Sequence, residues 1–207
     1  MSRESLHQAT EFEVVTMDCF DEAVDVLCDA FFDYPVMRYL VGDAGDDYGR
    51  QLRLLVEFFS RARHLRGDLV WAVRSEGRIS GVANIVCPDT MAPPELHEAR
   101  WQLWAELGGE VRRRYEAFGE ATAAFSISEP HYHLSMIGVR AANAGQGIGR
   151  RLLDGLHSRS AADSGSVGVS LTTEDPANVA LYEHFGYEIV GRAEVGDFSS
   201  WGFFRRD

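Results

Sequence analysis

The sequence predicts a mixed α/β fold. Apolar residues recur at helical spacing in two N-terminal segments, at about 21–32 and 48–64. Two strand-like runs follow at about 70–74 and 79–86. In the C-terminal half, a β-branched run leads into a glycine-rich loop, a helical pattern and another strand. Helices and strands therefore share one chain without a repeat or an obvious linker, which is typical of a single mixed domain.

The N-terminal elements follow from the spacing of their apolar residues. A first strand is expected near residues 12–16, and the helix after it carries Val24, Leu27 and Phe31 on one stripe. The pair Glu76-Gly77 separates the next two strands and predicts a tight hairpin between them. The second helix presents an apolar stripe formed by Leu52, Leu55, Val56 and Phe59.

The most informative segment runs from residue 132 to 192. A strand at 132–139 leads into Gly145-Gln146-Gly147-Ile148-Gly149-Arg150, where a helix begins. Glycines at alternate positions open conformations closed to other residues and leave the amides bare. Unpaired N–H groups and the dipole of the helix favour a phosphate or pyrophosphate there. An ordinary tight connection between strand and helix is the alternative interpretation of these glycines.

The loop departs from two common nucleotide motifs. It reads G-x-G-x-G, whereas the dinucleotide fingerprint reads G-x-G-x-x-G and opens a βαβ unit. A kinase-type phosphate loop needs a lysine, and all 20 residues counted as Lys or Arg are arginines. Lysine Schiff-base chemistry is excluded by the same count.

Asn178 and Tyr182 are four residues apart, which places them on the same face of the helix predicted there. A helical tyrosine usually packs in the core because its ring buries well. An asparagine beside it is harder to explain by packing. The pair therefore indicates a face turned toward a ligand.

These residues resemble the GNAT superfamily of acyl-CoA-dependent N-acyltransferases. The resemblance rests on Ile137-Gly138-Val139, the loop from Gly145 to Gly149 and the segment from Asn178 to Tyr187, in the order and separation of the family. It covers about residues 130–205. More loosely, the segment Ala30 to Pro35 and the segment Glu194 to Trp201 look like the puromycin N-acetyltransferase branch.

The resemblance implies a fold and a reaction. The expected fold is one domain over 1–207, a central, mostly antiparallel twisted sheet of about six or seven strands flanked by helices. A helical insert is expected at about 90–125, between the third and fourth strands. The implied reaction is transfer of an acetyl group from acetyl-CoA to a primary amine of a small molecule. The amine attacks directly, without a covalent enzyme intermediate.

The resemblance also assigns roles to residues. Tyr182 matches the acid that protonates the leaving thiolate, because a phenol of pKa about 10 stays protonated at pH 7. Asn178 matches the amide that hydrogen-bonds the cofactor. The pyrophosphate would be held by the main-chain amides of Gly145, Gly147, Gly149 and Arg150.

Other positions of the family pattern fall on the strand and on the first helices. The backbone at Ile137 and Val139 would pair with the pantetheine arm as an added strand does. Ala144 stands where the motif has Gln or Arg, and the usual proline after the strand is missing, which affects loop shape and cofactor affinity. Phe31, Phe32, Tyr34 and Met37 stand where the first helices of the family commonly form the wall of the acceptor pocket, although core packing is the default interpretation of such apolar residues.

Amine acetylation needs a proton acceptor, because an alkyl amine of pKa about 10.4 is protonated at neutral pH. Strand alternation places His131, His133 and Ser135 on one face. We select His133 as the general base, since a histidine of pKa about 6.5 is largely neutral at pH 7. Glu129 and Glu174 are reserve candidates. A structural or solvent-facing histidine stays open, and so does a histidine metal pair, which lacks supporting ligands.

Composition bounds the remaining functions. The 207 residues are 45% hydrophobic, enough for one buried domain. The sequence has no signal-peptide pattern and no apolar run of about 18 residues, so we expect a cytoplasmic protein. Its three cysteines are not spaced as metal-ligand pairs, so we expect no bound metal. The net charge of −12 opposes binding to nucleic acid or an anionic membrane and attracts amines, although acidic surfaces also serve solubility. A homodimer is one open option.

Residues 88–130 carry apolar side chains at helical spacing around Gly108-Gly109, which predicts one or two amphipathic helices. A lid over the acceptor site and ordinary packing against the sheet are both compatible with this pattern. Two rival functions stay open as well. One is a non-catalytic acyl-CoA sensor, and the other is a nucleotide-dependent oxidoreductase, which the glycine spacing opposes.

Overall fold

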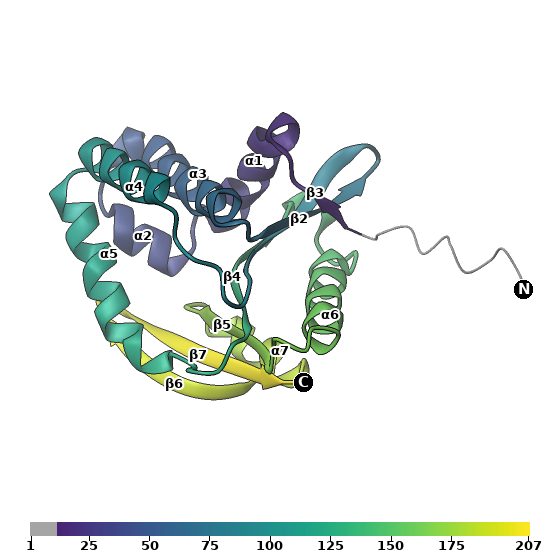
Figure 1. The fold of residues 1–207 in the computed structure, drawn as a ribbon. Helices are drawn as coiled ribbons and strands as arrows, with labels where there is room; N and C mark the ends of the chain where they lie inside the picture. Colours follow the sequence, from purple (N-terminus) through teal and green to yellow (C-terminus); the bar gives the residue numbers. More distant parts are fainter. Residues whose placement is uncertain (1–11) are drawn as a thin grey trace, which may run out of the picture.

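The computed structural model describes residues 12–207 and shows a twisted central sheet with helices packed around it (Figure 1). Within these residues the sheet has seven strands in the order β1-β2-β3-β4-β5-β7-β6. Each neighbouring pair is antiparallel except β4 and β5, which are parallel. The strands are β1 (Glu13–Val14), β2 (Leu69–Ser75), β3 (Arg78–Val86), β4 (Tyr132–Val139), β5 (Gly168–Thr173), β6 (Glu188–Val195) and β7 (Phe198–Arg206).

The mixed fold and the mostly antiparallel sheet are confirmed. The α-helices of the described part are α1 (Phe20–Phe31), α2 (Pro35–Val41), α3 (Tyr48–Arg66), α4 (Pro94–Leu107), α5 (Gly109–Thr122), α6 (Ile148–Ala161) and α7 (Ala177–His184). Short 3-10 turns lie at Met17–Cys19, Gly45–Asp47, Ala123–Phe125 and Ala141–Asn143. None of the helices in this part combines the length and hydropathy of a membrane span.

Local sequence explains the boundaries of several elements. Glu76 and Gly77 both have positive φ, 53° and 81°, which is the backbone of a tight hairpin turn between β2 and β3. Gly108, with φ 84°, ends α4 and starts α5, as the glycine pair predicts. Helix α2 is not expected from the sequence, because its seven residues are too few to show a periodic pattern.

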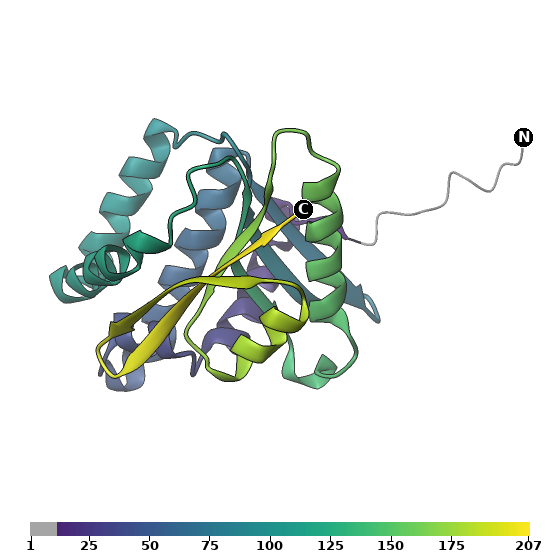
Figure 2. The ribbon, with the colours of Figure 1, turned by 90° about the horizontal axis from the view of Figure 1, so that it is seen from below.

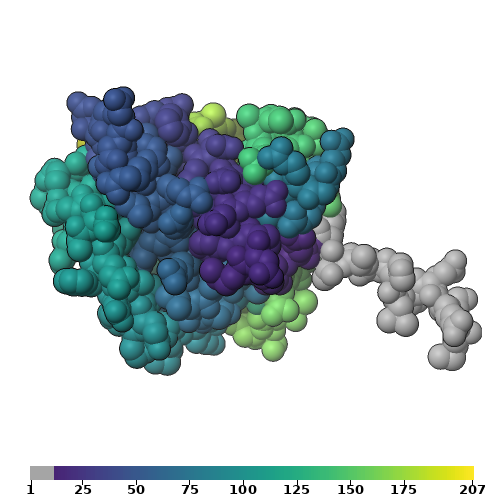
Figure 3. All heavy atoms as spheres, turned by 90° about the horizontal axis from the view of Figure 1, so that it is seen from above, coloured from purple at the N-terminus to yellow at the C-terminus, as the bar shows by residue number. Residues whose placement is uncertain are grey.

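The sheet separates two apolar clusters. Strand alternation places Val70 and Ala72 of β2 in the cluster with α1 to α5, and places Trp71 and Val73 in the cluster with α6 and α7. Seen from above, α1 lies at the surface between α3 and the β2–β3 hairpin (Figure 3). Both faces of the central strands are therefore covered, which explains their nearly continuous burial.

The sheet opens between its two parallel strands. β4 and β5 pair only at Tyr132 to Leu134 and Val169 to Leu171, although β4 continues to Val139. The β6–β7 hairpin, in yellow in Figure 2, extends beyond this opening, and Phe198 packs on Tyr39 of α2 with ring centroids 5.6 Å apart. The opening is therefore bounded by helices of the N-terminal half and by the C-terminal hairpin.

Candidate active site

A cavity of about 570 Å³ lies where β4 and β5 separate. It collects side chains from the first half of the chain and from the C-terminal segment, which are far apart in sequence. Gly145 and Gly147 are not among its lining residues and belong to the turn before α6. The predicted site residues that line the cavity are His133, Ile137, Val139, Gly149, Arg150, Asn178 and Tyr182.

The free edge of β4 faces this opening. The amide of Arg140 donates to the carbonyl of Ser80 at 2.9 Å, so the main chain of Arg140 points toward β3. Because successive residues of an antiparallel strand alternate their hydrogen-bonding direction, the main-chain groups of Val139 and Ile137 point away from β3. They therefore face the opened side, where an extended ligand can add a strand.

The glycine loop needs glycine for conformation rather than for space. Gly145 and Gly147 both have φ 76°, a left-handed backbone that other residues rarely adopt, and an added Cβ at either position would meet no atom within 4 Å. Gly147 is the N-cap of α6, and its carbonyl accepts the amide of Arg151 at 3.0 Å. The amides of residues 148–150 precede this first helical bond and are available to an anion.

Asn178 and Tyr182 lie on one face of α7, as their spacing predicts. The Asn178 side-chain amide donates to Thr173 Oγ1 at 3.3 Å. Tyr182 is 6% exposed, lines the cavity, and packs against the ring of Phe203 at 5.7 Å. Burial, followed by the negative charge of Glu174, raises the pKa of Tyr182 to about 12. This phenol is therefore fully protonated at neutral pH and is able to donate a proton.

Glu174 brings a titratable carboxyl into the cavity at the end of β5. It is 4% exposed, and its Oε1 accepts a hydrogen bond from Ser200 Oγ at 2.7 Å. Burial raises its pKa to about 7. The amide of Glu174 donates to the Tyr34 hydroxyl at 3.0 Å, and the same hydroxyl bonds Thr173 Oγ1 at 2.8 Å. A carboxyl of this kind exchanges protons readily near neutral pH.

His133 lines the same cavity with different chemistry. Its Nδ1 lies 2.8 Å from Ser170 Oγ, and burial lowers its pKa to about 4, with smaller contributions from His131 and Arg63. The imidazole is neutral at pH 7 but a weaker base than a free histidine. Within residues 12–207, no three His, Cys, Asp or Glu side chains gather as they would around a metal ion. The reserve candidate Glu129 is exposed, is not among the cavity-lining residues, and pairs with Arg206 at 2.8 Å.

Comparison with known proteins shows a likeness to N-acetyltransferases. Residues 99–189 match the family model described as an acetyltransferase (GNAT) domain. An uncharacterised N-acetyltransferase of Schizosaccharomyces pombe is 27% identical over 181 residues, which cover 81% of this chain and 70% of the relative. The chain is thus similar to N-acetyltransferases of the GNAT superfamily in this segment and in its fold. The activity of such proteins is acetyl transfer, which decides against the oxidoreductase alternative.

Solved structures agree with a GNAT fold. The crystal structure of a histone acetyltransferase HPA2 and related acetyltransferase from Corynebacterium glutamicum has a TM-score of 0.68 at 23% identity and covers 94% of both chains. Arylalkylamine N-acetyltransferase 2 from Aedes aegypti has a TM-score of 0.63 at 13% identity, covering 93% of this chain and 96% of its own. The looser likeness to the puromycin branch stays a prediction.

The N-terminal helices form the cavity wall opposite the open strand. Phe31, Tyr34 and Met37 line it as predicted, whereas Phe32 does not. Phe32 is 45% exposed, and its ring packs edge-on against Tyr48 at 5.2 Å, outside the cavity. Helix α5 adds further wall residues, so part of the 88–130 segment reaches the site. These residues are Tyr115 and Phe118.

Proposed function

We propose that this protein acetylates the primary amine of a small molecule with acetyl-CoA, by direct attack of the amine. The observation that carries the proposal is the shared cavity of Tyr182 and Glu174, one a protonated phenol and the other a carboxyl of pKa about 7. One group suits proton donation and the other suits proton acceptance at neutral pH. Both are needed for transfer from a thioester to an amine.

The residues around the opening fit acetyl-CoA. The bare amides at the start of α6, including those of Gly149 and Arg150, suit the pyrophosphate, and the turn with Gly145 and Gly147 exposes its backbone without steric hindrance. The free edge at Ile137 and Val139 suits the pantetheine arm. Asn178 lines the cavity with Tyr182 and suits a hydrogen bond to the cofactor. When bound, acetyl-CoA supplies an activated acetyl group and a thiol leaving group.

The protein moves two protons in the proposed reaction. The Glu174 carboxylate accepts a proton from the incoming ammonium, which its own negative charge attracts into an apolar cavity. Tyr182 donates its proton to the departing sulfur and is reprotonated by the second proton that the attacking nitrogen loses as the amide forms. His133, which the sequence predicts as the proton acceptor, is the second candidate for that role, because its lowered pKa of about 4 makes it the weaker base.

The acceptor wall favours an amine with an apolar or aromatic body. Aromatic side chains of Phe31, Phe59, Tyr115 and Phe118 line the cavity. Such surfaces bind flat apolar groups through burial and ring contacts. The Aedes aegypti neighbour is by name an arylalkylamine N-acetyltransferase, which agrees with this choice of substrate class. Nucleic acid and membrane are not proposed as partners, and the cytoplasmic location and the homodimer stay predictions.

A thiol-release screen tests the function. Purified protein is mixed with acetyl-CoA and a panel of primary amines, and free thiol is measured along with the acetylated product. We expect thiol release that requires both the protein and an amine with an apolar body. Coenzyme A binding in calorimetry without thiol release from any amine would instead support the non-catalytic sensor. Absence of coenzyme A binding by folded protein would contradict both.

A further inference from the structure

A buried arginine forms part of the cavity wall opposite α7. Arg63 stands one helical turn after Phe59 on α3, and both side chains line the cavity. The Arg63 side chain is only 15% exposed. Burial lowers its pKa, yet a guanidinium keeps its charge at any pH near neutral. The predominantly apolar cavity therefore contains a fixed positive charge.

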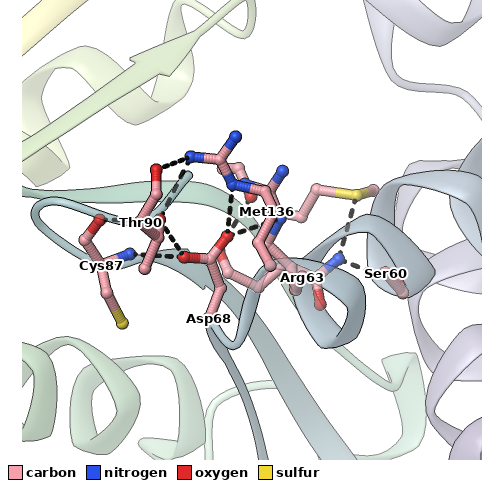
Figure 4. A network of polar contacts seen from close by, with 9 residues as sticks. Ser60, Arg63, Asp68, Cys87, Thr90 and Met136 are labelled. Carbon is pink, nitrogen blue, oxygen red and sulfur yellow. Dashed lines mark hydrogen bonds and ion pairs between the residues drawn. The ribbon is translucent and has the colours of Figure 1, made fainter. Parts of the chain in front are cut away.

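The carboxylate nearest to Arg63 is already saturated. Asp68 Oδ1 accepts hydrogen bonds from the Cys87 amide at 3.0 Å and from the Thr90 hydroxyl at 2.8 Å. Asp68 Oδ2 accepts from Arg66 Nε at 3.1 Å, and Arg63 Nε is 3.5 Å away from that oxygen (Figure 4). Arg63 Nε is buried and forms no hydrogen bond within the described residues. Asp68 thus holds Arg63 in place without satisfying its donors.

The charges of this cluster do not balance. Arg63 and Arg66 share the single carboxylate of Asp68, whose side chain is fully buried, so one positive charge is left uncompensated beside the cavity. A buried charge without a partner is costly, and a guanidinium presents a planar fork that matches a carboxylate. The cluster is therefore complete only when an anion enters the cavity.

The unpaired charge lies at the end of the cavity away from Glu174. Arg63 is close enough to His133 for its charge to lower the pKa of that imidazole. His133 pairs across the sheet with Ser170, and Glu174 follows four residues later, directly after β5 ends. At about 3.3 Å per residue, four residues of strand span roughly 13 Å. The basic end and the proton-accepting end are thus separated by the length of a small organic molecule.

We infer that the acceptor carries a carboxylate, or an anion of like geometry, at the end opposite its amine, and that Arg63 binds this group. The inference rests on the proposed function and narrows its substrate class to amino acids whose two groups stand at opposite ends of an apolar body. Arg63 is then a specificity-determining residue. It orients the amine toward Glu174 and takes no part in the chemical step.

Matched substrate pairs test the inference on the unmodified protein. We compare para-(aminomethyl)benzoate with its carboxamide, and ε-aminocaproate with its carboxamide, in the thiol-release assay. Because a charge-assisted hydrogen bond would be lost with the amide, kcat/KM should be at least about 10-fold higher for the acid of a pair. Equal rates, or a preference for the amides, would overturn the inference while thiol release itself still supported the proposed function.

Variants locate the effect at Arg63. Arg63→Gln should raise KM for the acid by about 10-fold or more, leave kcat nearly unchanged, and leave the amide kinetics within about twofold. Arg63→Lys keeps a charge and should retain part of the preference. Arg61→Gln removes an exposed arginine of the same helix and should leave the kinetics with both the acid and the amide unchanged. An Arg63→Gln protein that is folded and slows acid and amide equally would overturn the assignment. If that variant does not fold, the substrate pairs decide.

Discussion

At the residue scale, Tyr182 and Glu174 acquire their properties from burial. Both side chains are less than a tenth exposed, and in each case loss of solvent raises the pKa. For the phenol this shift secures the protonated form. For the carboxyl it moves the titration into the range where a general base works best at neutral pH. Burial thus sets the protonation states of both the proposed acid and the proposed base.

Replacing Tyr182 by phenylalanine should lower kcat by about 100-fold, because a general acid contributes a factor of about 100 to 10,000. The KM for acetyl-CoA should change little, since the ring and its packing remain. Steady-state kinetics with a saturating amine measures both values. Tyr187→Phe is the matched control, because Tyr187 is equally buried and bonds His157 but is not among the cavity-lining residues. Unchanged turnover in Tyr182→Phe would assign the acid role elsewhere.

Glu174 should also make stability depend on pH. Its pKa is raised from 4.5 to about 7 in the folded protein, so between these values the folded state holds a proton that the unfolded state has lost. This contribution to stability is present below pH about 4.5 and is lost as pH rises through about 7. Denaturant unfolding of wild type and Glu174→Gln should therefore differ increasingly between about pH 4.5 and 7, by up to about 3 kcal/mol. A pH-independent difference would show that the carboxyl titrates normally.

The kinetic consequence of the same carboxyl is a rise of kcat/KM as pH increases through about 7. Glu174→Gln should remove this limb, whereas His133→Gln should keep it because His133 has a pKa of about 4. Loss of the limb in the histidine variant alone would restore His133 as the base. The two variants thus separate the proton acceptor predicted from sequence from the one that the structure favours.

At the element scale, the start of α6 depends on a left-handed backbone. Gly147 has φ 76°, and a Cβ in that conformation costs roughly 1 to 2 kcal/mol. Gly147→Ala should therefore destabilise the protein by about that amount in denaturant unfolding, despite open space around the new methyl group. Gly119→Ala, at an equally open position inside α5, should instead be neutral or stabilise by up to about 1 kcal/mol. Equal effects of both changes would contradict the conformational argument.

Helices α4 and α5 pack against the N-terminal helices through buried apolar side chains. Leu103 and Leu107 of α4 and Val111 of α5 are buried in the cluster that also contains α1 and α3. Tyr115 then reaches the cavity from a helix anchored in the core, stacking with Phe59 at 6.2 Å. Of the two roles left open by the sequence, ordinary packing agrees better with this burial than a lid that lifts from the site.

At the scale of the whole molecule, the site exists because the sheet opens between β4 and β5. The opening brings Tyr34 of the first helices to Thr173, 139 residues away in sequence, and exposes the edge of β4 to a ligand. The β6–β7 hairpin supplies Ser200 to Glu174 from the other side. The helices before β4 and the segment from β4 onward both contribute residues to the cavity, so neither part has the site by itself.

The sequence alone determined the elements whose signals are local. The hairpin at Glu76-Gly77, the glycine turn before α6 and the shared face of Asn178 and Tyr182 depend on backbone preference and on helix or strand period, which act over a few residues. Those predictions required no knowledge of distant contacts. The strand from Tyr132 to Val139 is correct in both bounds for the same reason.

Only the tertiary structure decided which groups are acidic, basic or charged within the cavity. The sequence selects His133 as the base, keeps Glu174 in reserve only because it borders the same region, and gives no signal for Arg63. Burial lowers the pKa of His133 and raises the pKa of Glu174. Arg63 shares the carboxylate of Asp68 with Arg66. Solvation and charge pairing depend on which groups are neighbours in the folded structure, and the spacing of residues in the sequence does not give that information.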